Sequence, residues 1–220
     1  MRVLLIVGGW SSEREISLRG GKGIATALEE RGHRVTWLDL QEGFDTLLTV
    51  AAQHDFCFIN LHGSPGEDGL VQAMLEANHC PYQGSGAAGS FLALHKAASK
   101  QVFRRAGLLT ADWEFLPTRP PHLWEPQLPY PLFVKSNTGG SSLHLSRAEN
   151  KADLDTILDE IFNAGDEALI EPVIQGEEVT CGILGDLALP PILIQPAPGS
   201  FFDYTSKYAA VSDGGAREIC

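Results

Sequence analysis

Positive charge is scarce in this sequence. Its 220 residues include 16 Lys and Arg against 28 Asp and Glu, which gives a formal net charge of −12. Proteins that bind nucleic acid neutralise the phosphate backbone with clustered Lys and Arg, so the deficit argues against DNA or RNA as a partner. It does not exclude a nucleotide, which needs only one or two well-placed cations. We interpret the acidic excess as a solvated surface.

Long apolar runs are also lacking. No run is long enough to span a membrane. The first nine residues, MRVLLIVGG, are too short for a signal peptide and contain no cleavage site. These absences predict a cytoplasmic protein that has no membrane partner.

Cysteine is rare, and its spacing does not fit a metal site. The four cysteines are Cys57, Cys80, Cys181 and Cys220. Cys57 and Cys181 lie within apolar runs, so we expect both to be small core residues. This usage suits a reducing compartment.

The first 86 residues alternate between strand and helix patterns. Residues 2–7, 33–40 and 55–63 are expected strands, and the first is a continuous apolar run, typical of a strand covered on both faces. A helix is expected after the turn GGWSSERE, and another begins near Asp68, which we expect to be its N-cap. The βαβαβ order predicts a doubly wound parallel sheet, an α/β fold that binds ligands beyond the carboxyl ends of its strands.

The rest of the chain changes to an α+β pattern. One short helix is expected over 91–107, followed by a rigid proline-rich loop. A strand, a glycine-rich flap, a second strand and a helix over 149–162 come next, and further strands follow. The apolar face of that helix is predicted to comprise Leu154, Ile157, Leu158, Ile161 and Phe162. The expected divisions are 1–86, 87–175 and 176–220. The chain ends at REIC without a polar tail, which suggests that the sequence is a fragment.

The flap segment LFVKSNTGGSSLHLS poses the main chemical question. Lys135 stands before TGGSS, and Walker A spacing is absent. The segment is either a solvated hairpin or a cover whose amides and hydroxyls bind anionic oxygens. Lys96 has the same ambiguity, because a surface lysine on an amphipathic helix explains it equally well. For Lys100, Arg104 and Arg105 we prefer that surface interpretation.

Several carboxylates and aromatic residues allow two interpretations. Glu13 either stabilises a helix N-terminus or receives a substrate ammonium, and His62 either caps a strand or contacts a carboxylate. Glu171 and Glu178 are either solvated strand ends or contacts to an adenine and a ribose. The segment FFDYTSKY is either a half-exposed strand or a loop that closes over a polyanion.

Six segments in order resemble the D-alanine–D-alanine ligase family of the ATP-grasp superfamily. They are GGWSSEREISL, LHGSPGEDG, PYQGSG with LHK, VK…GSS, ALIE…GEEVT and FFDYTSKY. The resemblance implies a doubly wound pre-ATP-grasp domain followed by an α+β ATP-grasp domain, here incomplete. It also implies a cytoplasmic enzyme of peptidoglycan precursor synthesis, with ATP and Mg²⁺ as cofactors and a homodimer as the default assembly.

The implied reaction joins two D-alanines. ATP phosphorylates one carboxylate, and the amino group of the second D-alanine attacks the acyl phosphate, so the protein's tasks are positioning and charge stabilisation. The resemblance assigns Glu13, Ser141 and Tyr208 to a catalytic triad and His62 to the first substrate. The residues that it assigns to the nucleotide are Lys96, Lys135, Ser142, Glu171, Ile174, Glu178 and Lys207.

The sequence departs from the family pattern at several points. Ser136 replaces a usual proline, His144 replaces a glycine, and Pro172 replaces a frequent lysine. The first two changes suggest a looser flap. The family's metal ligands, an Asp and a Glu-x-Asn, are expected beyond Cys220, so we assign no metal ligand in this chain and expect little ligase activity from it.

Two alternatives remain open from the sequence. One is a related ligase that joins D-alanine to D-lactate or D-serine. The other is a module that binds a nucleotide or an amino acid without catalysis, although the joint presence of Glu13, Ser141, Lys207 and Tyr208 favours a catalytic protein.

Overall fold

The structure, a computed structural model, describes residues 1–140, 145–195 and 215–219. The chain divides into two compact units, Met1–Ser99 and Lys100–Cys220. The expected divisions after residues 86 and 175 stay predictions.

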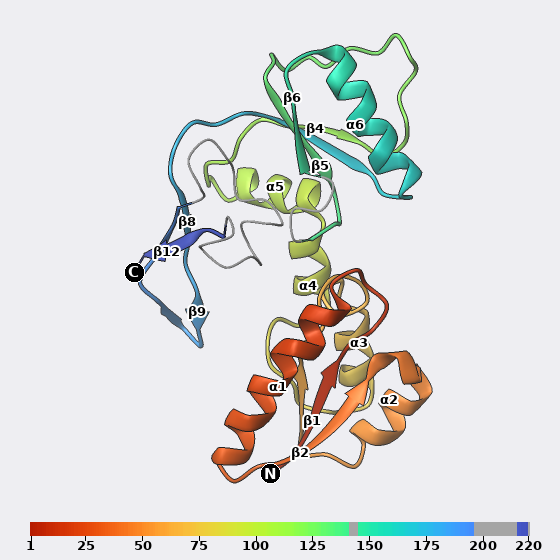
Figure 1. Cartoon of the computed structure of the whole chain (residues 1–220), viewed down its shortest axis with the longest axis vertical. Helices are drawn as coiled ribbons and strands as arrows, with labels where there is room; N and C mark the ends of the chain where they lie inside the picture. The colour runs from red at the N-terminus through yellow and green to blue at the C-terminus, as the bar shows by residue number, and fades with distance from the viewer. Residues whose placement is uncertain (141–144, 196–214, 220) are drawn as a thin grey trace. The chain divides into compact units, whose positions relative to one another are not determined.

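A parallel sheet forms the centre of the first unit. β1 (Arg2–Val7) lies between β2 (Arg34–Asp39) and β3 (Phe56–Ile59), and both neighbours run parallel to it (Figure 1). The apolar run of β1 is almost fully buried, with Leu4, Leu5 and Ile6 all at 0% exposure. The predicted βαβαβ unit and its parallel sheet are therefore confirmed.

Helices cover both faces of this sheet. Alternate residues of β1 point to opposite faces, so they pack into two different core clusters. Leu5 and Val7 pack with Ala25 of α1 (Arg14–Glu30), whereas Leu4 and Ile6 belong to the opposite core cluster. That second cluster also takes in residues of three further elements: the 3₁₀ helix η1 (Leu40–Glu42), α2 (Phe44–Ala51) and α3 (Leu70–Ala77).

Two details of the helices differ from the sequence prediction. Gly69, not Asp68, is the N-cap of α3, and the Asp68 carboxylate accepts a hydrogen bond from the backbone N–H of Leu70 at 2.9 Å. The single helix expected over 91–107 is two helices, α4 (Ala87–Leu94) and α5 (Lys96–Arg105). They separate because His95 has an extended backbone, with φ −78° and ψ 91°, which interrupts the helical hydrogen bonds.

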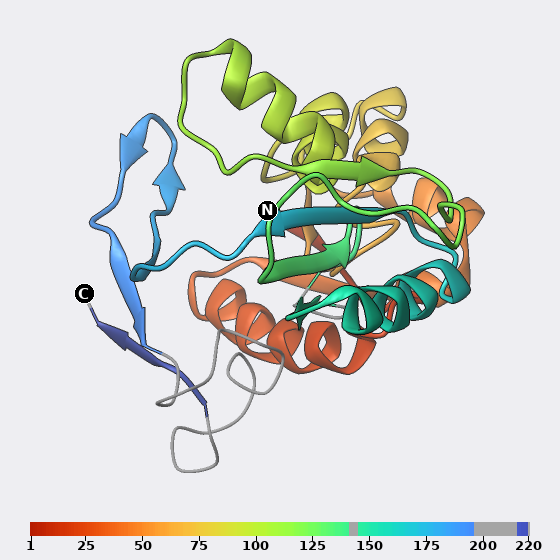
Figure 2. The same ribbon diagram turned by 90° about the horizontal axis from the view of Figure 1, so that it is seen from above.

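An antiparallel sheet organises the second unit. Its strand order is β4 (Glu114–Leu116), β7 (Ala168–Pro172), β5 (Leu132–Ser136) and β6 (Leu145–Ala148). Helix α6 (Lys151–Asn163) covers one face (Figure 2). Of its five predicted apolar residues, Leu154, Ile157, Leu158 and Ile161 are buried and Phe162 is half-buried against the same cluster. The two strands on either side of the flap and the helix that follows them are confirmed, and residues 141–144 of the flap lie outside the described residues.

The remaining strands of this unit are short and more exposed. They are β8 (Glu178–Thr180), β9 (Ile183–Leu184), β10 (Leu187–Ala188), β11 (Ile192–Gln195) and β12 (Arg217–Ile219). Cys57 is buried as predicted, but Cys181 is exposed, so its assignment to a core was wrong. The apolar pattern VTCGIL predicts a strand, but it does not show whether another layer covers that strand. No described helix is long and apolar enough to cross a membrane.

Candidate functional site

In the first unit, polar residues gather where the parallel strands end. Arg14 donates to Asp39 Oδ1 through Nη1 at 2.7 Å and forms a second contact with Oδ2 through Nη2. Asp39 Oδ1 also accepts from the N–H groups of Gly9 at 3.2 Å and Gln41 at 3.0 Å. The Arg14 guanidinium lowers the pKa of Asp39 to about 2. The arrangement fixes the turn after β1 to the end of β2.

A second set of hydrogen bonds ties the same turn to the end of β3. Ser17 Oγ accepts from the N–H of Gly8 at 2.8 Å and donates to the carbonyl of Asn60, whose Nδ2 donates to the Ser17 carbonyl at 2.8 Å. Gly8 has φ +72°, and a Cβ there would lie 2.3 Å from Asp39 Oδ1. Only glycine fits this position, because the close approach leaves no room for a side chain.

Glu13 and His62 come from the two loops that these bonds hold. Glu13 is 4% exposed, is the N-cap of α1, and accepts through its backbone carbonyl from the N–H groups of Ile16 and Ser17, both at 3.0 Å. A Cβ on Gly63 would lie 3.9 Å from Glu13 Oε2, so the carboxylate borders the loop that carries half-buried His62. A buried acid beside a histidine-bearing loop suits a small ligand with an ammonium group.

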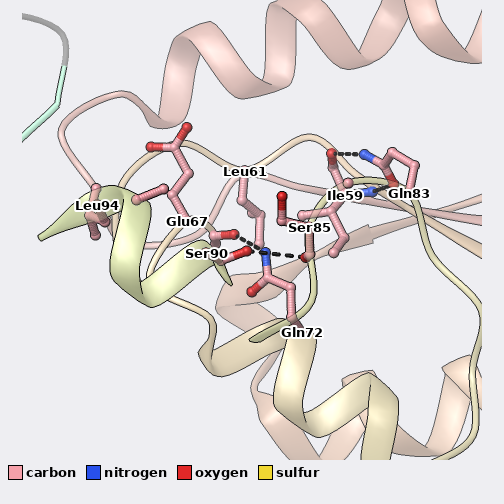
Figure 3. Close-up of a pocket in the computed structure, with 11 residues that line it drawn as sticks. Ile59, Leu61, Glu67, Gln72, Gln83, Ser85, Ser90 and Leu94 are labelled. Carbon is pink, nitrogen blue, oxygen red and sulfur yellow. Dashed lines mark hydrogen bonds between the residues drawn. The ribbon is translucent and has the colours of Figure 1, made fainter. Parts of the chain in front are cut away.

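A cavity of about 440 Å³ lies next to this loop, between the end of β3, α3 and α4 (Figure 3). Gln72 is 6% exposed, and its Nε2 donates to the Gly66 carbonyl at 2.7 Å. Glu67 accepts from the Gly63 N–H at 2.7 Å, so it also braces the loop. Neither Glu13 nor His62 belongs to the lining, which comprises Ile59, Leu61, Gly66, Glu67, Gln72, Gln83, Gly84, Ser85, Ser90, Ala93 and Leu94.

In the second unit, the sheet face opposite α6 carries a buried charge cluster. Phe133 of β5 pairs directly with Glu171 of β7, and Lys135 pairs with Leu169. Lys135 and Glu171 are therefore diagonal neighbours on one face, within reach of a long side chain. They form an ion pair through Lys135 Nζ and Glu171 Oε2.

Lys100 of α5 contacts the other oxygen of the same carboxylate. Its Nζ binds Glu171 Oε1 and donates to Thr110 Oγ1 at 2.7 Å, and it lies 5.3 Å from the ring centroid of Trp113. Lys100 is 7% exposed, so its interpretation as a surface lysine was wrong. A lysine can lie inside a protein when its charge is paired and hydrogen-bonded, and the amphipathic pattern of α5 does not reveal such a partner.

Glu171 is ionised in this environment. Burial by itself raises the pKa of its carboxyl group, but the charges and hydrogen bonds of Lys135 and Lys100 outweigh that effect, and the net pKa lies below the ordinary value. Its solvated alternative is excluded, since Glu171 is 9% exposed. Two cations on one anion leave one positive charge in excess, which favours an anionic ligand.

The first residues of the flap are anchored to the turn between α6 and β7. Ser136 is 2% exposed, and its Oγ binds Asp166 Oδ2 and accepts from the Gly139 N–H at 2.6 Å. Thr138 Oγ1 donates to Asp166 Oδ1 at 2.9 Å. The serine that replaces the family's usual proline therefore gives this end of the flap a side-chain attachment.

The other expected site residues have different positions. Glu178 is exposed at the start of β8, and Ile174, after β7, is 69% exposed. Lys96 is half-buried at the first position of α5. Ser141, Ser142, His144, Lys207 and Tyr208 lie outside the described residues, so the triad of Glu13, Ser141 and Tyr208 stays a prediction.

The sequence interpretation missed several residues that position the site. Arg14 is part of the quoted turn, and Asp39 is the residue before the end of the strand predicted over 33–40, so their pairing had a local signal. Lys100 and Asp166 had no such signal in the sequence, because their partners Glu171 and Ser136 are distant in the chain. In the part of the chain that the structure describes, no group of three or more His, Cys, Asp or Glu residues is placed to hold a metal ion.

Comparisons with known proteins identify the family of this chain. Residues 98–219 match the family model described as D-ala D-ala ligase C-terminus. The D-alanine–D-alanine ligase of Desulfovibrio desulfuricans is 64% identical over all 220 residues, which span 71% of that protein. The corresponding ligase of Lawsonia intracellularis is 55% identical, and the chain spans 72% of it.

Solved structures give the same result. The crystal structure of D-alanine–D-alanine ligase from Bacillus anthracis has a TM-score of 0.83 at 35% identity and covers 99% of this chain, which spans 71% of that protein. The same ligase complexed with ATP has a TM-score of 0.82 at 32% identity, covering 99% of this chain and 69% of that one. With this identity over its whole length, the chain belongs to the D-alanine–D-alanine ligase family.

Proposed function

We propose that this chain provides the amino-acid site and the nucleotide site of an ATP-dependent ligase that joins two D-alanines. The observation that carries the proposal is the cluster of Lys100, Lys135 and Glu171 in the segment that matches the ligase family, where Lys135 lies on the strand that leads into the flap. Its excess positive charge and its adjoining glycine-rich backbone suit the phosphates of a nucleotide.

On this proposal the first unit binds D-alanine. Glu13 would receive the substrate ammonium, because its carboxylate is buried beside the loop that carries His62. His62 would contact the substrate carboxyl group. Arg14, Ser17 and Asp39 would hold the two loops in place and would not touch the substrate, since their side chains are occupied with one another and with backbone groups.

The second unit would bind ATP. Lys135 would contact phosphate oxygens together with Ser142 of the flap and Lys207. The family resemblance also assigns Lys96 to the phosphates and Ser141 and Tyr208, with Glu13, to a catalytic triad. Glu171 would face the adenine amino group beside the backbone of Ile174, and Glu178 would bind the ribose hydroxyls. When bound, ATP supplies the phosphoryl group that converts a D-alanine carboxylate into an acyl phosphate, which the second amino group then attacks. The protein's part is orientation and charge stabilisation.

The remaining parts of the proposal concern the cation, the assembly and the role in the cell. Mg²⁺ would neutralise the transferring phosphoryl group, with ligands beyond residue 220, as the family pattern implies. A homodimer, a cytoplasmic location and a role in peptidoglycan synthesis and cell shape follow from the same resemblance. Their support is the family relationship.

Calorimetric titration of the chain with MgATP tests the nucleotide site. We expect saturable binding that weakens by about tenfold or more when Lys135→Met removes a charged phosphate contact. Arg105→Met is the matched control, since Arg105 is exposed on α5 and has no assigned role. Absence of binding by the unchanged chain, or equal affinity in the Lys135 variant, would contradict the proposal.

The amino-acid site and turnover are tested in the same samples. Glu13→Gln should weaken the binding of D-alanine and leave ATP affinity unchanged. Because we place the Mg²⁺ ligands beyond residue 220, D-alanine-dependent phosphate release by this chain should be low. Robust release would show that this placement of the metal ligands is wrong.

A further inference from the structure

The two lysines that share Glu171 are held differently. Lys100 has three contacts, to the Glu171 carboxylate, the Thr110 hydroxyl and the face of Trp113. Its side chain is 9% exposed. These contacts hold the Lys100 ammonium group in one position.

Lys135 is held less firmly. Its side chain is 27% exposed, and its one ion pair within the described residues is with Glu171. It lies on β5, the strand that leads into the flap, whereas Lys100 lies on α5. Of the two cations, Lys135 is the one that can move toward a ligand without leaving a packed position.

A carboxylate in this position needs at least one cation at all times. Glu171 is 9% exposed, and an ionised group that is buried without a partner is strongly destabilised. If Lys135 left Glu171 and no second lysine were present, that cost would oppose the departure. Lys100 removes the cost, because it continues to pair with the carboxylate.

We propose that Lys100 is a positioning residue that stays on Glu171 so that Lys135 can leave this carboxylate and bind a nucleotide phosphate. The inference rests on the proposed function, since it requires that Lys135 serves a phosphate. Lys100 acts through Glu171 and does not touch the nucleotide. Its removal traps Lys135 as the only remaining counterion of Glu171.

The proposal makes an unusual prediction for a pair of variants. Lys100→Met should weaken phosphate binding, because the phosphate must then compete with Glu171 for Lys135. Adding Glu171→Gln to that variant should restore the binding, because Lys135 is no longer captured. The double variant also replaces a buried ion pair by two neutral groups, a change that proteins often tolerate.

Titration with inorganic tripolyphosphate and with MgATP, followed by calorimetry, measures this effect. We expect Lys100→Met to weaken tripolyphosphate binding by about tenfold, in line with the loss of one charge-assisted contact. Lys100→Met combined with Glu171→Gln should return to the wild-type affinity or exceed it. Lys100→Arg, which keeps the charge, should bind within about threefold of wild type, and Arg105→Met should be unchanged. Tripolyphosphate is the decisive probe, because it has no adenine for Glu171 to contact.

The outcomes separate this inference from the proposed function. If the wild-type chain does not bind tripolyphosphate or MgATP, or if Lys135→Met has no effect, the proposed function fails and the inference with it. If Lys135→Met weakens binding but Lys100→Met does not, the inference alone is overturned. Equal weakening in Lys100→Met and in the double variant would indicate a direct phosphate contact by Lys100 and would also overturn it. Should Lys100→Met fail to fold in a thermal scan, the double variant still decides, because wild-type affinity without Lys100 is expected only from the proposed exchange.

Discussion

The two units stabilise charge in different ways. In the first, Arg14 and Asp39 form a one-to-one pair in which both side chains are about a quarter exposed, at 27% and 26%. In the second, two lysines share Glu171, whose side chain is 12% exposed. The charges of Arg14 and Asp39 cancel, and their pair fixes the turn after β1. The second has an excess cation and is therefore equipped to receive an anion.

The difference shows how position within a sheet affects function. Asp39 lies at the end of a strand, where backbone N–H groups of neighbouring loops complete its hydrogen bonding. Glu171 lies within a strand, whose own N–H groups serve the sheet, so only side chains can neutralise it. A carboxylate of the second kind depends on its lysine partners for stability.

The largest expected effect comes from breaking the buried cluster. Glu171→Gln leaves Lys100 and Lys135 close together without a counterion, so we expect the second unit to lose about 3–5 kcal/mol of stability. Thermal unfolding and hydrogen exchange of the β5 and β7 amides both measure this loss of stability. The matched control is Lys100→Met combined with Glu171→Gln, which should be more stable than Glu171→Gln alone; a less stable double variant would contradict the role of Glu171 as a counterion.

A smaller effect is expected from breaking the partly buried pair of Arg14 and Asp39 in the first unit. Asp39→Asn should lower the melting temperature at neutral pH by about 2–5 °C, since it weakens the contacts that hold the turn after β1. The folded pKa of Asp39 is about 2, below the ordinary 3.8, so its contribution is present above pH 4 and is lost as the pH falls toward 2.

The pH dependence gives this prediction its control. The difference in melting temperature between wild type and Asp39→Asn should close between about pH 4 and pH 2. Asp55, whose pKa is also lowered to about 2 by Arg2, has a more exposed side chain at 39%, so Asp55→Asn should have a smaller effect over the same window. If the melting temperatures of wild type and Asp39→Asn still differed fully at pH 2, the ion pair would not be the source of the difference.

The smallest expected effect concerns the base of the flap. Ser136→Ala removes the Oγ that accepts from the Gly139 N–H and binds Asp166, so we expect a loss of about 1 kcal/mol and faster exchange of the Gly139 amide. Hydrogen exchange followed by NMR resolves this single amide. Thr138→Val is the comparison variant, since it removes a different Asp166 contact, and an unchanged Gly139 rate in Ser136→Ala would show that the serine does not anchor this turn.

The sequence predicted the elements that have a strong local signal, but α2 and β4 were not predicted and α4 and α5 were expected as one helix. The run RVLLIV predicted the buried central strand, and the spacing of Leu154, Ile157, Leu158 and Ile161 predicted the buried face of α6. Errors arose where the deciding contact is not local. Lys100 looked like a surface lysine because its charge partner is far along the chain, and Cys181 looked like a core residue because its strand pattern does not report whether a further layer covers it.

The sequence by itself determined the order of strands and helices, the glycine turns at the sheet edge and the family resemblance, since these depend on residue type and short spacing. Tertiary structure alone decided which charges meet. Lys100 reaches Glu171 across 71 positions, Ser136 reaches Asp166 across 30, and Arg14 reaches Asp39 across 25. Side chains so far apart in the chain become neighbours only when strands pair and helices pack, and that pairing determines which charges are buried and which can bind a ligand.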